Sequence, residues 1–206
     1  GGILADDRGL GKTVQIIALL LDEKERRGGV SLIVCPASLV YNWEREIHRF
    51  APELTVRMVA GNAAQREAAL RDQGETDVYI TSYDLLKRGI PLYEGKRFAY
   101  QVVDEAQYIK NPATQSAKAV KCVTADTRFA LTGTPMENRL SDLWSIFDYL
   151  MPGFLFGYPW FRGHFELPVM KEQDRKALEN LRRLTGPFIL RRLKRDVLKE
   201  LPEKLE

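Results

Sequence analysis

The sequence predicts an α/β domain in which helices cover both faces of a mostly parallel sheet. Short apolar runs alternate with longer stretches of helical periodicity along the first 135 residues, and this alternation is typical of parallel strands joined by helices. Loops that carry glycine, hydroxyl and carboxylate groups follow the apolar runs. In a parallel sheet such loops gather at the carboxyl edge, where ligands bind. We therefore expect a functional site at that edge.

The individual elements follow from periodicity and from the residues that end each run. Gly28 and Gly29 end the first helical stretch, and Ser38 is a suitable N-terminal cap for the second. Val102 and Val103 lie in a short apolar run typical of a buried strand. The expected strands are residues 3–5, 30–35, 54–60, 77–81, 99–104 and 128–132. The expected helices are residues 14–27, 38–50, 63–73, 82–88, 114–123, 141–150 and 171–184.

The pattern changes after Pro135. An aromatic-rich stretch at 154–165 is followed by a charged helical stretch at 171–184. We expect a sheet domain at residues 1–135 and a helical appendage at 136–206 that continues the same lobe. Three tryptophans are expected to fill the core or the seam between these parts: Trp43, Trp144 and Trp160.

Composition and cysteine usage exclude several classes of protein. The net charge of +3 is too small to indicate a polyanionic partner by itself. Cys35 and Cys122 are far apart, so neither a disulfide framework nor a zinc site is expected, and a reducing compartment is. No run reaches transmembrane length, no signal peptide is visible, and no membrane partner is expected. The chain opens on Gly-Gly without an initiator Met, so we expect a fragment of a longer protein.

The stretch DDRGLGKT at residues 6–13 has the composition of a phosphate-binding loop. It precedes a helix, and the first turn of a helix directs backbone N–H groups and a positive dipole at one point. Gly9 and Gly11 accept the positive φ that such a turn needs. Lys12 is placed to reach the β- and γ-phosphates, and the Thr13 hydroxyl is placed to bind Mg²⁺.

Two further loops contain groups suited to the same chemistry. Asp104 ends an apolar run, where its carboxylate can hold Mg²⁺ opposite Thr13. Glu105 can then orient and deprotonate an attacking water. The loop at 132–135, TGTP, offers two hydroxyls beside a flexible glycine that can sense the γ-phosphate.

Each of these motifs alone has a plainer interpretation. Asp6 stands where the pattern G-x-x-x-x-G-K-[ST] has glycine, so residues 6–13 could form an ordinary turn at a helix start. The pair at 104–105 could be a surface acidic pair, and the loop at 132–135 a plain strand-to-helix turn. The combination of the lysine loop and the acidic pair in a parallel-sheet pattern favours a single nucleotide site.

The motifs also stand in a familiar order. DDRGLGKT is followed by LIVCPASLVYNW at 32–43, ITSYD at 80–84, VVDEAQYIKN at 102–111, LTGTPMENRLSDLWSIFDYLMPG at 131–153 and FILRRLKRDVLKELPEK at 188–204. Together they resemble the first RecA-like lobe of a helicase superfamily 2 motor, and more narrowly the Swi/Snf family of double-stranded-DNA translocases. The resemblance covers nearly the whole chain.

This resemblance implies ATP and Mg²⁺ as cofactors and assigns a role to individual positions. The catalytic residues would be Lys12, Asp104 and Glu105, with Glu105 as the general base. The nucleotide would be bound by Gly9, Leu10, Gly11, Lys12, Thr13 and Gln107, and the metal by Thr13 and Asp104. The DNA face would include Ser38, Thr81, Ser82, Tyr83, Lys110, Asn111 and Asn138, which would grip phosphates without reading sequence.

The resemblance also implies partners and a location. These partners are double-stranded DNA, a second RecA-like lobe that this chain lacks, and a DNA-bound protein substrate. We expect ATP-driven movement along duplex DNA, with a nearly inactive isolated fragment because the arginine finger would come from the second lobe. The location would be the cytoplasm with the nucleoid in a prokaryote, or the nucleus in a eukaryote. A catalytically silent nucleic-acid-binding scaffold and a strand-separating helicase remain alternatives.

Three features are left open by the resemblance. Arg8 stands where the family usually has Met, and Gln107 stands where His is more familiar. The basic cluster at 191–195 is either a solvated helix face or an element near the DNA or between the lobes.

Overall fold

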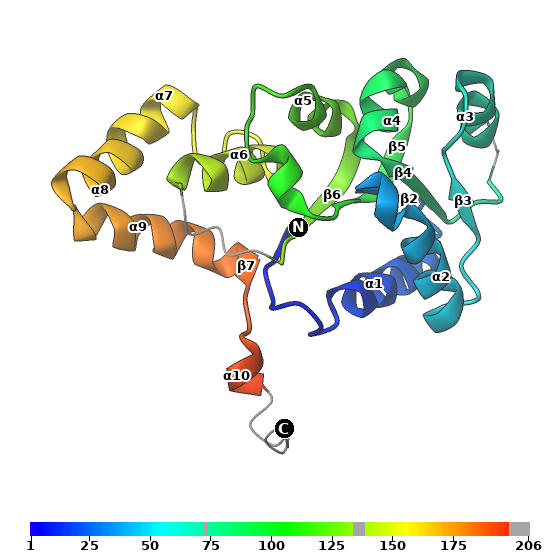
Figure 1. Cartoon of the computed structure of the whole chain (residues 1–206), viewed down its shortest axis with the longest axis horizontal. Coiled ribbons are helices and arrows are strands. Elements are labelled where there is room, and N and C mark those ends of the chain that lie inside the picture. Colours follow the sequence, from blue (N-terminus) through cyan, green and yellow to red (C-terminus); the bar gives the residue numbers. More distant parts are fainter. Residues whose placement is uncertain (72–73, 134–138, 198–206) are drawn as a thin grey trace.

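The computed structural model describes residues 1–71, 74–133 and 139–197, and it confirms the predicted α/β architecture (Figure 1). Seven strands form one sheet in the order β3-β4-β2-β5-β6-β1-β7, and neighbouring strands in the described chain pair in parallel. The strands are β1 (Gly2–Leu4), β2 (Ser31–Cys35), β3 (Val56–Met58), β4 (Val78–Ser82), β5 (Arg97–Val103), β6 (Thr124–Leu131) and β7 (Ile189–Leu190).

Helices cover both faces of the sheet. They are α1 (Lys12–Arg27), α2 (Val40–Phe50), α3 (Ala63–Leu70), α4 (Tyr83–Arg88), α5 (Gln115–Cys122), α6 (Leu140–Leu150), α7 (Tyr158–Phe161), α8 (Leu167–Glu172), α9 (Arg175–Thr185) and α10 (Lys194–Val197). Helices α1 and α2 lie on one side, and α4, α5 and α6 on the other (Figure 1).

Strand β2 shows how one apolar run serves two cores. All five of its residues are buried. Ile33 and Cys35 pack in the core that contains α1 and α2, whereas Leu32 and Val34 pack in the core that contains α4, α5 and α6. Successive side chains of a strand point to opposite faces, so a strand covered on both faces needs apolar residues at every position.

Two predicted details of the helices are wrong. Ser38 does not cap a helix, because residues 37–39 form a 3₁₀ turn and α2 begins after Leu39 without a side-chain cap. The expected helix at 171–184 is interrupted at Gln173, which has a φ of 49°. Asp174 then starts α9 by accepting a hydrogen bond from the Ala177 N–H at 3.0 Å.

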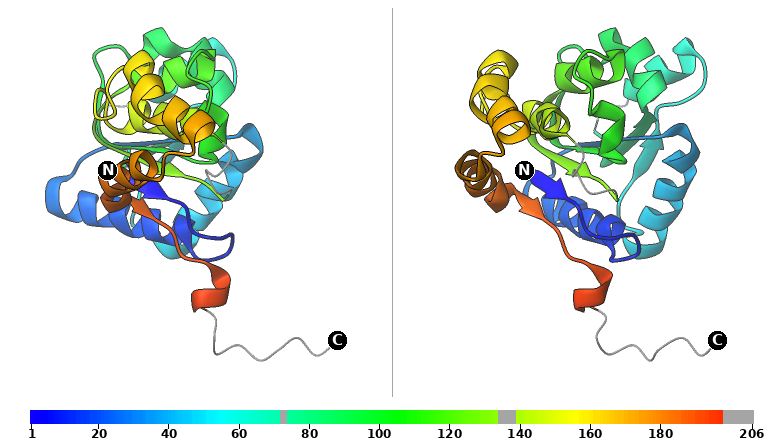
Figure 2. Two further views of the ribbon diagram at one scale, coloured as in Figure 1. Left: turned by 90° about the vertical axis from the view of Figure 1, so that its left-hand side faces the viewer. Right: turned by 60° about the vertical axis from the view of Figure 1, so that its left-hand side comes forward.

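Strand β7 brings the end of the described chain back into the sheet beside β1. Ile3 pairs with Ile189 and Leu4 with Leu190, and both views in Figure 2 show this strand next to the N-terminal one. The region expected to be a helical appendage therefore contributes an edge strand as well. The division at residue 135 stays a prediction.

Aromatic contacts fasten the segment after α6 to α6 itself. The Phe147 ring lies 5.8 Å from the Phe154 ring, and the Trp144 ring lies 5.3 Å from the Tyr158 ring. Trp43 and Trp144 are buried as expected, but Trp160 is 39% exposed and stacks on His164 instead of filling the core. Within the described ranges, no helix is long and apolar enough to cross a membrane.

Candidate nucleotide site at the carboxyl edge of the sheet

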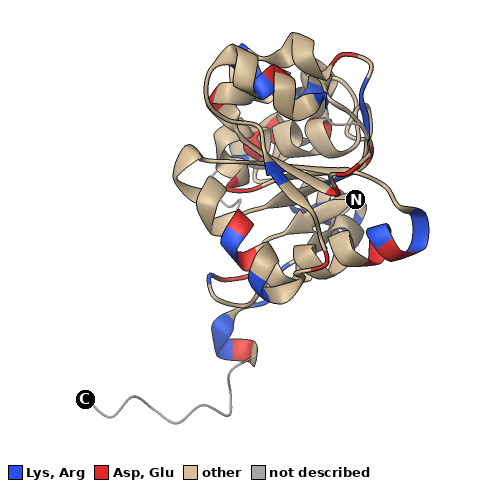
Figure 3. Cartoon of the chain, turned by 90° about the vertical axis from the view of Figure 1, so that its right-hand side faces the viewer, with Lys and Arg blue, Asp and Glu red and all other residues tan. Residues whose placement is uncertain are grey.

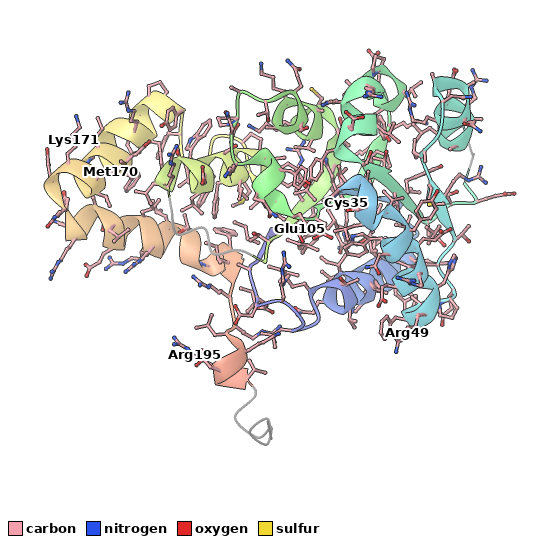
Figure 4. The ribbon with its side chains drawn as sticks, viewed as in Figure 1. Cys35, Arg49, Glu105, Met170, Lys171 and Arg195 are labelled. Carbon is pink, nitrogen blue, oxygen red and sulfur yellow. The ribbon has the colours of Figure 1, made fainter. Side chains whose placement is uncertain are left out.

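The strand order brings the three polar loops to one edge. Strands β5, β6 and β1 are consecutive neighbours, so the loops that follow them lie side by side. The Thr132 N–H donates to the Leu4 carbonyl at 3.0 Å, which joins the loop after β6 to the end of β1. Figure 4 shows Glu105 near the middle of the molecule, where the strands end. Loops about ninety residues apart in sequence therefore share one edge.

The loop at residues 6–13 has the backbone of a phosphate-binding turn. Gly9 and Gly11 have φ values of 84° and 83°, as the sequence predicted, and Gly11 precedes the first residue of α1. Leu10 donates its N–H to the Asp7 carbonyl at 3.3 Å. Thr13 lies in the first turn of α1 and is partly buried. The loop thus ends at a helix N-terminus, where an anion is stabilised.

Lys12 is held by the backbone of its own loop. Its ammonium donates to the Asp6 carbonyl at 2.6 Å and to the Asp7 carbonyl at 3.3 Å. The side chain therefore folds back toward the start of the loop, with its charge at the Asp6 and Asp7 carbonyls. A phosphate bound at the turn could replace these carbonyls as the acceptor.

The carboxylate of Asp104 is fixed from two sides. Oδ2 accepts a hydrogen bond from Trp43 Nε1 at 2.8 Å, and Oδ1 accepts one from the Glu105 N–H at 2.8 Å. Burial raises the pKa of Asp104 above its usual value; the Trp43 and Glu105 N–H hydrogen bonds and the positive charge of Lys12 oppose that shift, and the Glu105 charge adds to it. Lys12 is therefore close enough to Asp104 to favour its charged form.

The sequence did not predict the part played by Trp43. An apolar helix position suggested a core residue, and Trp43 is indeed buried, with 1% exposure. Its indole N–H nevertheless points at the acidic loop. The available signal was chemical, because a buried tryptophan needs an acceptor for its N–H.

Glu105 has a backbone conformation that is uncommon for a residue with a side chain. Its φ is 52° and its ψ is 58°, and such left-handed residues cluster at functional sites. Oε2 accepts a hydrogen bond from Gln107 Nε2 at 2.6 Å. Gln107 Oε1 is buried and has no hydrogen-bond partner among the described residues. The amide N–H of Gln107 therefore orients the carboxylate of Glu105, while its amide oxygen could accept a hydrogen bond from a further group.

Asp6 is buried and bound by a residue from the far end of the chain. Its side chain is 0% exposed, and Arg192 donates to it from the backbone at 2.7 Å and from Nη2 at 2.5 Å. Burial would raise the pKa of Asp6, but the hydrogen bonds and charge of Arg192 hold that pKa below its usual value. Neither interpretation of the basic cluster at 191–195 included this contact. No spacing rule could have paired residues 186 positions apart.

Arg8 spans the gap between two of the loops. A Cβ atom added to Gly133 would lie 3.2 Å from Arg8 Cγ and 3.3 Å from Arg8 Nε. The arginine chain therefore passes over the loop that follows β6.

The residues predicted for a DNA face fall into two groups. Ser38, Lys110 and Asn111 are exposed, so they remain available to a partner. Asn138 lies outside the described residues.

Thr81, Ser82 and Tyr83 are instead buried, with exposures of 1%, 3% and 3%. Thr81 Oγ1 donates to the Val59 carbonyl at 2.9 Å, and Ser82 Oγ accepts from the Leu85 N–H at 3.2 Å. Tyr83 donates its hydroxyl to the Asp104 carbonyl at 2.5 Å. Their hydroxyls are therefore used inside the protein in this structure, and the assignment of these three residues to a DNA face stays a prediction.

Comparisons with known proteins show the family to which the chain belongs. The model of the SNF2-related domain matches residues 1–206. An uncharacterized ATP-dependent helicase of Mycoplasma pneumoniae is 45% identical over 207 residues, which cover 100% of this chain and 20% of that protein. The TATA-binding protein-associated factor MOT1 of Saccharomyces cerevisiae is 39% identical and is matched over 99% of this chain and 12% of its own length.

A solved structure gives the same result for the fold. The SWI2/SNF2 ATPase core of Sulfolobus solfataricus in complex with double-stranded DNA superposes with a TM-score of 0.89 at 42% identity, covering 100% of this chain and 43% of that one. This chain thus spans about a fifth or less of the curated relatives named above. On the family match over its whole length, the chain belongs to the family of SNF2-related domains.

Proposed function

We propose that this chain is the first ATP-binding lobe of a Swi/Snf-type motor that moves along double-stranded DNA. The observation that carries the proposal is the position of the Lys12 loop and the Asp104–Glu105 loop at the same edge of the sheet. Membership of the SNF2-related family supports it. So does the likeness to an ATPase core solved with double-stranded DNA.

Each residue at this edge of the sheet would have its own role in ATP hydrolysis. Lys12 would exchange the carbonyls of its loop for the β- and γ-phosphates of ATP. Thr13 and Asp104 provide only oxygen donors, which suits Mg²⁺, and the bound ion would neutralise phosphate charge. Glu105 would take the proton of the attacking water. Gln107, which holds the Glu105 carboxylate, would couple this step to a second lobe.

DNA would be bound through its phosphates on the surface that contains Ser38, Lys110 and Asn111. These side chains are exposed. Phosphate contacts position a duplex without reading its sequence, as a motor that tracks along DNA requires. The second RecA-like lobe of the full-length protein and a DNA-bound protein substrate complete the proposal. Residues 1–135 would form the nucleotide-binding part, and residues 136–206 would continue the same lobe.

The test uses the full-length protein that contains this domain. Glu105→Gln removes the proposed base and keeps the amide contact, so we expect DNA-stimulated ATP hydrolysis to fall by about 10²-fold or more. The matched control is Glu25→Gln, which changes an exposed residue near the end of α1 and should leave the rate unchanged. Equal rates in the two variants would contradict the proposed role of Glu105.

Two companion assays separate the alternatives. Displacement of a third strand from a triplex reports movement along a duplex, whereas release of one strand from a duplex reports unwinding. We expect ATP-dependent triplex displacement without unwinding. Unwinding would favour the strand-separating helicase. DNA binding with neither activity nor ATP hydrolysis would favour the silent scaffold, against which the intact Lys12, Thr13, Asp104 and Glu105 argue.

The isolated chain is expected to be nearly inactive. In phosphoryl transfer an arginine finger contributes on the order of 10³–10⁵ in rate, and in this proposal that arginine comes from the second lobe. A phosphate-release assay on the 206-residue chain should therefore show hydrolysis close to background, with or without DNA.

A further inference from the structure

The segment at residues 190–194 runs along the start of the phosphate loop. Four hydrogen bonds join it to residues 5–7. Figure 2 shows the same path, from β7 beside β1 down to α10. Two of the bonds join backbone to backbone, and two join a backbone N–H to a carboxylate. They are Ala5 N–H to the Leu190 carbonyl at 2.8 Å, Asp7 N–H to the Arg192 carbonyl at 3.1 Å, Arg192 N–H to Asp6 Oδ1 at 2.7 Å, and Lys194 N–H to Asp7 Oδ2 at 2.9 Å.

Arg192 adds side-chain contacts to this ladder. Its Nη2 and Nε donate to Asp6 Oδ2 at 2.5 and 3.1 Å. Asp6 is fully buried, whereas the Arg192 side chain is 43% exposed. A buried carboxylate is stable only when it is paired. Both oxygens of Asp6 therefore depend mainly on one residue from the other end of the chain.

The same two aspartates hold the lysine of the loop through their backbones. The carbonyls of Asp6 and Asp7 accept the hydrogen bonds of Lys12 Nζ at 2.6 and 3.3 Å. A shift of Asp6 would move these carbonyls and the ammonium with them. The side chain of Asp6 faces Arg192 while its carbonyl faces Lys12, so this residue connects the segment at 190–194 to the nucleotide site.

We propose that Arg192 is a positioning residue of the nucleotide site: by binding Asp6 it fixes the phosphate loop in the conformation that presents Lys12. This inference rests on the proposed ATP site. It explains why the loop has an aspartate at the position where the phosphate-loop pattern has glycine. It also gives one member of the basic cluster, Arg192, a role inside the protein.

The experiment measures the dissociation constant of a fluorescent ATP analogue with Mg²⁺ in the full-length protein. Arg192→Gln should raise this constant by roughly 10- to 100-fold, as is usual when a supporting residue behind a binding group is lost. Asp6→Asn should have a similar effect, and the double variant should lose no more than either single one. Additive losses would overturn the proposal, because two residues that act through one contact cannot add.

Arg195→Gln is the matched control for charge and position. Arg195 lies on α10, outside the sheet (Figure 4), and its side chain is 81% exposed. Figure 3 shows acidic and basic residues together on this short helix. The control removes one positive charge from the residue that directly follows the segment at 190–194. If the effect of Arg192 comes from its contact with Asp6, the dissociation constant of the control should stay within about 2-fold of wild type. An equal effect of both variants would overturn the proposal in favour of general electrostatic attraction.

A Lys12→Ala background separates positioning from mere stability. In that background Arg192→Gln should weaken nucleotide binding by less than about 2-fold, because the group it positions is gone. A full further loss would overturn the proposal. Arg192→Lys keeps the charge and the backbone contact but lacks the guanidinium fork. It should give an intermediate constant, and it serves as the test if the glutamine variant does not fold.

The outcomes also separate this inference from the function on which it rests. If Lys12→Ala weakens nucleotide binding and Arg192→Gln does not, the positioning role is overturned and the nucleotide site stands. If Lys12→Ala leaves nucleotide binding intact, the proposed ATP site itself is overturned.

Discussion

The indole N–H of Trp43 donates a hydrogen bond to Asp104 Oδ2 at 2.8 Å. This bond connects helix α2, on one face of the sheet, to the acidic loop that follows β5. An indole N–H can donate but cannot accept, so it fixes Oδ2 as an acceptor. Together with the Glu105 N–H on Oδ1, it sets the direction in which the carboxylate can bind a metal.

Trp43→Phe should weaken the use of Mg²⁺ more than it weakens folding. The variant keeps an aromatic ring but removes the donor that lowers the pKa of Asp104. In the full-length protein we expect the ATPase rate at limiting Mg²⁺ to fall by about 10-fold, as for other residues that support a metal ligand, and to recover partly at high Mg²⁺. The measurement is the ATPase rate over a Mg²⁺ titration.

Trp144→Phe is the matched control for this prediction. Trp144 is also buried, but its Nε1 donates to the Phe156 carbonyl at 3.1 Å and not to the acidic loop. It should cost similar stability and leave the Mg²⁺ dependence unchanged. Identical Mg²⁺ curves for the two variants would refute the positioning of Asp104 by Trp43.

The contact between Asp6 and Arg192 predicts a sensitivity to acid. The pKa of Asp6 is lower in the folded chain than its usual value, because the Arg192 contacts outweigh burial. Such a carboxylate adds stability above its unfolded pKa of about 3.9, and that stability is lost as the pH falls through this value toward the folded pKa. Urea unfolding between about pH 5 and pH 3 should therefore show a smaller loss of unfolding free energy for Arg192→Gln than for wild type.

The direction of this difference is the informative result. In Arg192→Gln the buried Asp6 loses its cation, so its pKa should lie higher than in wild type and its contribution to the acid sensitivity should shrink. Arg195→Gln, which leaves Asp6 paired, should follow the wild-type curve. Parallel curves for wild type and Arg192→Gln would show that Asp6 does not titrate with a lowered pKa.

The positive φ of Gly9 predicts that any side chain at this position would strain the backbone. Gly9 has a φ of 84°, and a Cβ atom there would lie 3.5 Å from Lys194 Nζ. A left-handed conformation costs an ordinary residue about 1–2 kcal/mol, so Gly9→Ala should lower the unfolding free energy by about that amount. The loop should also change shape and bind ATP more weakly. Unfolding curves and nucleotide titrations check the two effects.

Gly163→Ala provides the control for this substitution. Gly163 lies in a π-helical turn, its φ is not positive, and a Cβ there meets nothing within 4 Å. The same change should therefore leave stability and nucleotide binding close to wild type. A loss at Gly163 equal to that at Gly9 would remove the conformational explanation.

The sequence was sufficient for the sheet and for the loops that follow its strands. Runs such as residues 32–35 are apolar at every position because both faces of the sheet are covered, and such a local pattern can be recognised in the sequence. The positive φ values of Gly9 and Gly11 were readable for the same reason, since only glycine adopts them freely. The family motifs added the order of the site residues along the chain.

The features that the sequence left out depend on contacts between distant segments. Strand β7 has only two residues, too few to show a period, and it exists because β1 offers a free edge. The pair of Asp6 and Arg192 joins positions 186 residues apart. The motif also could not show that Thr81 donates to the Val59 carbonyl, because a hydroxyl at a strand end has the same sequence pattern whether it faces solvent or the protein interior.

Lys110 should contribute one phosphate contact to DNA binding. The proposed DNA surface contains its exposed ammonium beside Asn111, and each neutralised phosphate releases counterions. Lys110→Gln should therefore reduce the slope of log K against log salt by about 0.9 and weaken binding to duplexes of different sequence equally. Lys118→Gln removes the same charge at an exposed position on α5 that is not among the residues proposed to contact DNA, and it should keep the wild-type slope. Salt titrations of duplex binding by the full-length protein measure both slopes. If the two variants share the wild-type slope, Lys110 does not contact a phosphate and the DNA surface lies elsewhere on the lobe.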